Sequence, residues 1–210
     1  MPASHRSALI AAIVCVIAAL MLTQALAGEA DGEVVTGEPA VADGTVSWET
    51  IVAQGFELVV HKAARRMEVI SPRGDDGVAV RAWRIGLGFT PDGDKEMQGD
   101  GKTPEGSFRV TRRIPKSQYY KAFLISYPEV EDADRGQAAG LVSEATADSI
   151  RSAHAKGGVP NAYTSLGGLI EIHGLGGGSD WTLGCVAADN VVIDELWPYV
   201  KVGTRVRIKR

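Results

Sequence analysis

Three short segments with a strand-like residue pattern follow one another at residues 57–61, 66–70 and 78–85, and the third alternates apolar and other residues. A polar turn separates the first two, and a cluster containing Pro, Gly and Asp separates the second from the third. Period-two alternation bounded by turn residues is typical of β-strands. Strands that are joined by short turns pair antiparallel. The pattern therefore predicts an antiparallel sheet at the start of the folded part of the chain.

The rest of the pattern adds more strands and some helix. Further strands are expected over 107–114, 123–127, 168–173 and 204–208. Helical patterns cover 131–156, best defined over 144–156, and 190–200. The stretch 86–106 is polar and rich in Gly and Asp, and ordered loops of that length are usually functional. The expected fold class is mostly β, with inserted helices.

The amino terminus has the three parts of an export signal. Arg6 precedes an uncharged apolar run over 8–22, and Ala25-Leu26-Ala27 follows as a small-residue cleavage pattern. The run is shorter than the ~20 residues that a spanning helix needs. We expect residues 1–27 to be a signal peptide that sends the protein to the periplasm or cell envelope. An uncleaved anchor is the alternative.

Composition separates a linker from a folded domain. Residues 28–45 contain five acidic side chains and no basic one, so they are expected to form an acidic linker. Residues 46–210 are then one domain. The whole chain carries a net charge of -4. A protein that binds nucleic acid through a basic surface is therefore excluded, and a membrane contact is expected only through the signal peptide.

One cysteine remains beyond the signal, and it lies close to a histidine in the sequence. His173 ends a predicted strand, a glycine-rich loop follows, and Gly184-Cys185 comes next. An imidazole beside a thiol can take its proton and give a thiolate–imidazolium pair, which is an activated nucleophile. The turn at Gly184 can aim backbone N–H groups at a developing oxyanion. The alternative is an inert core thiol and a hydrogen-bonded histidine.

Four motifs occur in an order that resembles a known family. They are GKTPEGSF (101–108), IHG (172–174), DWTLGCVA (180–187) and VGTRVRI (202–208). Together they are similar to the L,D-transpeptidase catalytic domain of the YkuD family, over residues 56–209. The form DWTLGC resembles the branch that contains the YafK-type murein enzymes. Leu183 stands where many members have a second histidine, and Ala187 where many have arginine.

The resemblance implies a fold, a reaction and a substrate. The fold is a YkuD-like β-sandwich or barrel. Cys185 is the nucleophile, His173 the general base, and Gly184 part of the oxyanion hole. The substrate is the tetrapeptide stem of peptidoglycan, which forms a thioester with the enzyme and is joined to another stem or to a wall-attached lipoprotein.

Two other functions stay open. A carboxypeptidase or hydrolase would use water at the same site, cleaving the same linkage or releasing wall-bound lipoprotein. A non-catalytic wall-binding module would keep the fold alone.

Several neighbouring residues are candidates for smaller roles. Trp181, Thr182 and Ser179 are candidate substrate-lining residues, although Thr182 and Ser179 can equally brace the loop. Glu171 can orient the imidazole of His173, and a backbone carbonyl can do the same. We expect no cofactor and no metal, because the histidines outside the site are isolated and the aspartates of 86–106 lack calcium-loop spacing.

Overall fold

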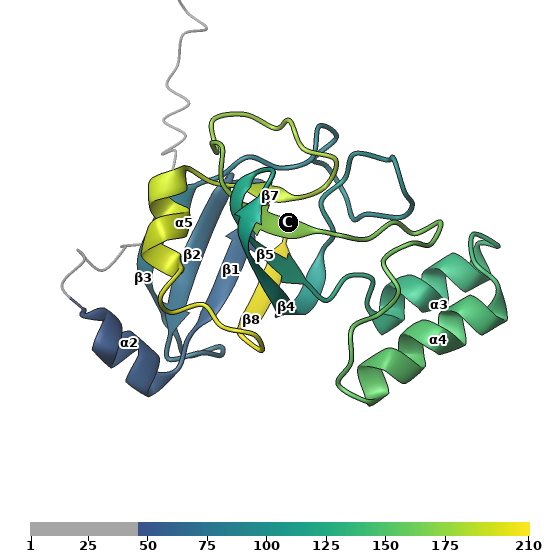
Figure 1. The fold of residues 1–210 in the computed structure, drawn as a ribbon, viewed down its shortest axis with the longest axis horizontal. Coiled ribbons are helices and arrows are strands. Elements are labelled where there is room, and N and C mark those ends of the chain that lie inside the picture. The colour runs from purple at the N-terminus through teal and green to yellow at the C-terminus, as the bar shows by residue number, and fades with distance from the viewer. Residues whose placement is uncertain (1–45) are drawn as a thin grey trace, which may run out of the picture. The chain divides into compact units, whose positions relative to one another are not determined.

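The computed structural model describes residues 46–210. The predicted signal peptide (1–27) and acidic linker (28–45) lie outside the described residues. Among the described helices, none is long and apolar enough to cross a bilayer. The strands are β1 (Glu57–His61), β2 (Arg66–Ser71), β3 (Val78–Arg84), β4 (Gly106–Ser117), β5 (Tyr120–Ile125), β6 (Glu171–His173), β7 (Val186–Ala187) and β8 (Arg205–Lys209) (Figure 1).

The strands form one mixed sheet of eight in the order β3-β2-β1-β8-β4-β5-β6-β7. The three strands β1, β2 and β3 pair antiparallel, as predicted, whereas β1–β8 and β6–β7 are parallel. Gly86, just after β3, exchanges two backbone hydrogen bonds with Ala187 of β7. The two ends of the strand order are therefore joined, and the expectation of a mostly β, barrel-like fold with inserted helices is confirmed.

The residues predicted as helical over 131–156 form two helices with a break between them, and the best-defined part, 144–156, is confirmed as the second helix. They are α3 (Val130–Ala138) and α4 (Glu144–Ala155), which lie side by side in Figure 1. Gly140 between them has a φ of +72°, which ends helical geometry. Ser143 then starts the second helix, because its hydroxyl accepts the Thr146 N–H.

The other two described helices flank the sheet. The helix predicted from Asn190 is α5 (Asn190–Leu196), which is shorter than expected. The sequence analysis did not predict α2 (Trp48–Gln54). Val192, Ile193 and Leu196 of α5 join the main core beneath the sheet, and α3 and α4 enclose a second, smaller core. The residues of that second core are Ala133, Ala147, Ile150 and Leu166.

The long loop 86–106 is held by charged and polar side chains. The buried Lys62 ammonium donates to the Thr103 carbonyl (2.7 Å) and to Glu105 (3.0 Å). The Asp100 carboxylate accepts three backbone N–H groups of the loop, and Lys95 pairs with it at 2.7 Å. The Thr103 hydroxyl accepts the Gly88 N–H (2.9 Å). These contacts fix the loop beside the segment that carries Cys185.

Candidate active site

Cys185 and His173 line one cavity of about 400 Å³. In the parallel pair β6–β7, Ile172 lies opposite Val186 and His173 opposite Ala187. Alternate residues of a strand share a face, so Glu171 and His173 point to the side on which Cys185 enters β7. The cavity is lined by Ile114, Ser117, Gln118, Tyr119, Gly168, Leu169, Ile170, Glu171, His173, Trp181, Thr182, Leu183 and Cys185.

A backbone carbonyl orients the imidazole of His173, which is only 1% exposed. Its Nδ1 lies 2.7 Å from the Gly174 carbonyl oxygen. Because a carbonyl can only accept, Nδ1 carries the proton and Nε2 keeps its lone pair. Of the two orienting groups considered from the sequence, the carbonyl is therefore the one found, and the Glu171 side chain does not contact the ring nitrogens.

Two aromatic rings hold the imidazole from the sides. Tyr119 stacks on His173 with ring centroids 4.5 Å apart and planes 24° from parallel. Trp181 meets the same imidazole edge-on at 5.5 Å and donates its indole N–H to the Gly176 carbonyl. Trp181 thus lines the cavity, and its contact with substrate stays a prediction. Tyr119 was missed, because it lies in the turn between β4 and β5, and its closeness to β6 depends on strand order.

The thiol of Cys185 is partly buried in the wall of the cavity. Its Sγ accepts a hydrogen bond from the Glu171 N–H (3.4 Å) and lies 3.8 Å from the Leu169 carbonyl oxygen. Burial raises the pKa of Cys185 to about 11, and burial also lowers the pKa of His173. Both groups are thus neutral in the free protein at pH 7. The thiolate–imidazolium pair expected from the sequence is not the favoured resting form, because burial disfavours both charges more than the Glu171 N–H and the Gly174 carbonyl stabilise them.

Thr182 braces the backbone that carries the thiol. Its hydroxyl accepts the Gly184 N–H (3.1 Å) and donates to the Cys185 carbonyl (2.8 Å). This is the bracing role considered from the sequence. The Gly184 N–H was expected to face an oxyanion, but it is engaged by Thr182. Among the described residues no hydrogen bond uses the Cys185 N–H, which leaves that donor for substrate.

Gly184 cannot be replaced without strain. Its φ of +132° is a conformation that L side chains rarely adopt. A Cβ there would lie 2.7 Å from the Lys102 carbonyl oxygen. The glycine lets the chain pass close to the loop 86–106 and then enter β7 with the thiol turned into the cavity.

Ser179 and Asp180 lie outside the cavity lining. Ser179 is exposed, so its predicted substrate-lining role is not supported by its position. Asp180 accepts the Leu87 N–H (3.0 Å) and pairs with Arg65 (2.9 Å). It therefore ties the glycine-rich loop to the segment after β3. No group of three His, Cys, Asp or Glu side chains within residues 46–210 could hold a metal ion.

Glu171 is the one acidic side chain that lines the cavity. Within the part of the chain that the structure describes, no side chain pairs with its carboxylate and no donor hydrogen-bonds to it. Burial raises the pKa of Glu171. A half-buried carboxylate without a partner beside the thiol can receive a cationic or hydrogen-bond-donating group of a ligand.

Comparisons with known proteins agree with this geometry. The YkuD family, described as the L,D-transpeptidase catalytic domain, matches residues 55–208. The "Putative L,D-transpeptidase YafK" of Escherichia coli (strain K12) is 26% identical over 145 residues, which cover 68% of this chain and 46% of that protein. The chain thus spans less than half the length of this relative.

Solved structures share the fold. The helical cell shape determining protein Pgp2 of Campylobacter jejuni, as its K307A mutant, aligns with a TM-score of 0.51 and 24% identity over 74% of this chain and 47% of that one. The unmutated Pgp2 aligns with a TM-score of 0.50 and 23% identity, over 74% of this chain and 47% of that one. Since the family match covers the strands, the glycine-rich loop and Cys185, the chain belongs to the YkuD family of L,D-transpeptidase catalytic domains.

Proposed function

We propose that this protein is a cysteine-dependent L,D-transpeptidase that acts on peptidoglycan tetrapeptide stems in the cell envelope. The observation that carries the proposal is the shared cavity of Cys185 and His173, with the Nδ1–H of His173 held by the Gly174 carbonyl. That hydrogen bond leaves Nε2 as the only basic nitrogen of the imidazole. Cys185 is the only cysteine in the described part of the chain, so its thiol is the candidate nucleophile.

The first half of the reaction makes a thioester. Nε2 of His173 takes the proton of the Cys185 thiol as Sγ attacks the carbonyl carbon between the third stem residue and the terminal D-alanine. The Cys185 N–H, free of other partners, donates to the resulting oxyanion. The imidazolium then gives its proton to the D-alanine nitrogen, the C–N bond breaks, and D-alanine leaves. Neutral thiol and neutral imidazole are the correct starting forms for this transfer.

The second half transfers the acyl group to an acceptor. An amine attacks the thioester carbon, its proton passes through His173 to the sulfur, and an amide forms. The Glu171 carboxylate favours an amine over water, because an amine arrives as an ammonium ion that a carboxylate attracts. Its raised pKa also suits it to accept the proton that the ammonium must lose before attack. The acceptor amine belongs to a second stem or to a wall-attached lipoprotein.

Intact-protein mass measurement tests the first half. Incubation of the full chain with a tetrapeptide stem should add the stem minus D-alanine to Cys185. Cys185→Ala should abolish the adduct, and His173→Ala should slow its formation at least 100-fold. An adduct that persists in Cys185→Ala would refute the mechanism. A protein that binds sacculi but forms no adduct would be the non-catalytic wall-binding module.

Glu171→Gln tests the acceptor. This variant keeps the shape of the side chain and removes its charge, so we expect amide product to fall about tenfold at fixed amine while D-alanine release continues. Glu144→Gln, at an exposed position of α4, is the matched control. An equal fall in D-alanine release and joining would place Glu171 in the acylation step instead. Release of D-alanine or of anchored lipoprotein without joining, in the unmodified chain, would make the protein the hydrolase.

A further inference from the structure

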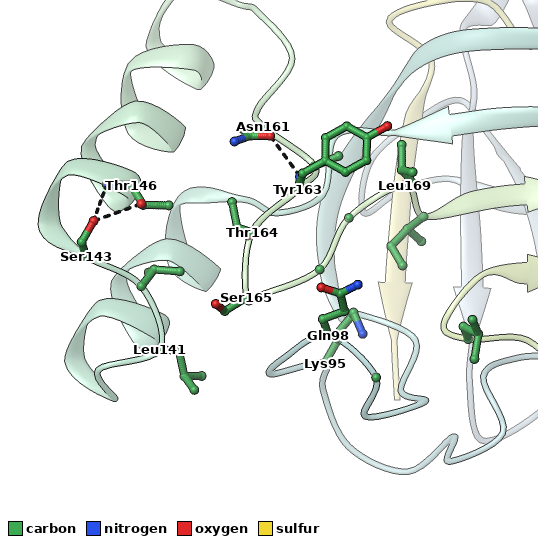
Figure 2. A pocket seen from close by; sticks show the side chains of 17 residues that line it. Lys95, Gln98, Leu141, Ser143, Thr146, Asn161, Tyr163, Thr164, Ser165 and Leu169 are labelled. Carbon is green, nitrogen blue, oxygen red and sulfur yellow. Dashed lines mark hydrogen bonds between the residues drawn. The ribbon is translucent and has the colours of Figure 1, made fainter.

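A second and larger cavity, of about 790 Å³, adjoins the one that holds the thiol. The two cavities share the lining residues Gly168, Leu169, Ile170 and Leu183. One wall of the larger cavity comes from the start of α4 and the residues before it, and the other from 161–170 and the loop 86–106 (Figure 2). A ligand that enters the catalytic cavity can therefore continue into this groove without leaving the protein surface.

The groove carries no uncompensated charge. Lys95 is its only charged lining residue, and its ammonium is buried, pairs with Asp100 at 2.7 Å and donates to the Met97 carbonyl. A charged peptide or an anionic polymer would find no partner of opposite charge there. The lining suits a neutral ligand.

Neutral hydrogen-bonding groups and one aromatic ring point to a sugar. The side chains of Gln98 and Ser165, the amide nitrogen of Asn161 and the hydroxyl of Tyr163 have no hydrogen-bond partner among the described residues. Tyr163 is 81% exposed and lines the groove together with the exposed Leu169 and Leu183, and a cluster of exposed apolar side chains of this kind marks a ligand-binding surface. Hydroxyl and amide groups match the hydroxyl and acetamido groups of an amino sugar, and the ring face matches its C–H surface.

The reach of the stem supports this assignment. If the proposed function holds, the reacting carbonyl lies at Cys185 and the stem runs back to its glycan through about three residues, which span at most ~10 Å. The glycan must then lie next to the catalytic cavity. The groove shares four lining residues with that cavity, whereas a third cavity, lined by Asp132, Arg135 and neighbouring residues, shares no lining residue with the catalytic cavity.

We infer that the groove lined by Leu141, Thr146, Asn161, Tyr163 and Gln98 binds the neutral glycan strand of peptidoglycan. This inference rests on the proposed function for the identity of the polymer. The turn between α3 and α4 forms one wall of the groove. In this inference, these two helices hold the sugar chain while its stem reacts.

A binding experiment that needs no catalysis tests the groove. The full chain carrying Cys185→Ala is titrated with a hexamer of N-acetylglucosamine, a neutral and peptide-free probe, and the shifts of backbone amide NMR signals are followed. We expect saturable binding that shifts the signals of residues 161–170. Adding Tyr163→Ala should weaken it about 3- to 10-fold, the range of an aromatic contact, while Tyr163→Phe should retain it. Val191→Ala, equally exposed on α5, is the control.

The outcomes separate this inference from the proposed function. No saturable binding of the hexamer, or binding that Tyr163→Ala leaves unchanged, would overturn the glycan groove. Weaker binding of a sugar-free stem in Tyr163→Ala would also overturn it, because the groove would then hold peptide. Hexamer binding, together with failure of the unmodified chain to form a thioester with a tetrapeptide stem, would leave the groove standing and refute the proposed function.

Discussion

The ring of Tyr119 stacks on the imidazole of His173, with centroids 4.5 Å apart. The two residues come from different parts of the chain, the turn between β4 and β5 and the end of β6. The Tyr119 carbonyl also accepts the Gly174 N–H (3.0 Å), so the turn and the strand end are fixed together. The stack shields one face of the imidazole from water and limits its rotation.

Removing the Tyr119 ring should let the imidazole of His173, the proposed general base, rotate more freely. We expect Tyr119→Ala to lower kcat for stem acylation about 3- to 10-fold, and Tyr119→Phe to retain it within about twofold. Loss of the shielding ring should also bring the lowered pKa of His173 back toward its ordinary value. The acid limb of the pH–rate profile should therefore move to higher pH in Tyr119→Ala. An unchanged limb with lower kcat would mean that Tyr119 acts only on substrate.

Gly184→Ala should destabilise the fold. The φ of +132° and the approach of a Cβ to the Lys102 carbonyl, 2.7 Å, both oppose a side chain there. We expect a loss of about 1–3 kcal/mol in the free energy of unfolding, together with loss of acylation. Gly178→Ala is the control in the same loop, because a Cβ at that position meets nothing within 4 Å. Chemical denaturation of both variants checks this, and equal stability would show that the loop adapts.

Thr182→Val should disturb the same segment through hydrogen bonds. Valine has almost the shape of threonine but cannot bond to the Gly184 N–H or the Cys185 carbonyl. With Thr182 buried, we expect a loss of about 1–3 kcal/mol in unfolding free energy and slower acylation. Thr182→Ser keeps the hydroxyl and should recover most of the rate. A Ser variant as slow as the Val variant would point to methyl packing instead.

The pKa shifts of His173 and Cys185 predict how acylation and thiol labelling depend on pH. Burial lowers the pKa of His173, so Nε2 stays unprotonated, and acylation active, down to a pH below the ordinary value of 6.5. Burial raises the pKa of Cys185 to about 11, so the thiolate fraction in the free protein grows roughly tenfold per pH unit up to that value. Iodoacetamide should therefore label Cys185 slowly at pH 7 and much faster at pH 10. Fast labelling at neutral pH would reveal a preformed thiolate–imidazolium pair.

The local residue pattern predicted which segments form strands and helices better than it predicted where each one begins and ends. Strand-like patterns bounded by turn residues predicted the three amino-terminal strands nearly residue by residue, since short hairpins join them. The helical pattern over 131–156 did not predict the break between α3 and α4. Gly140, with its positive φ, and the N-cap Ser143 lie within that pattern. The two-residue strand β7 was missed, because its residues are defined as a strand by pairing with β6 and Gly86, which are distant in the sequence.

The sequence alone determined the mostly β class and the order of motifs that belongs to the YkuD family, and it predicts His173 and Cys185 as the reactive pair. Those properties reside in local spacing and residue type. The tertiary structure decided that the Gly174 carbonyl orients the imidazole, that Thr182 occupies the Gly184 N–H, and that Tyr119 stacks on His173. Burial in the folded chain also raises the pKa of Cys185 and lowers the pKa of His173. Each of these depends on burial or strand order, which bring together groups that local spacing does not connect.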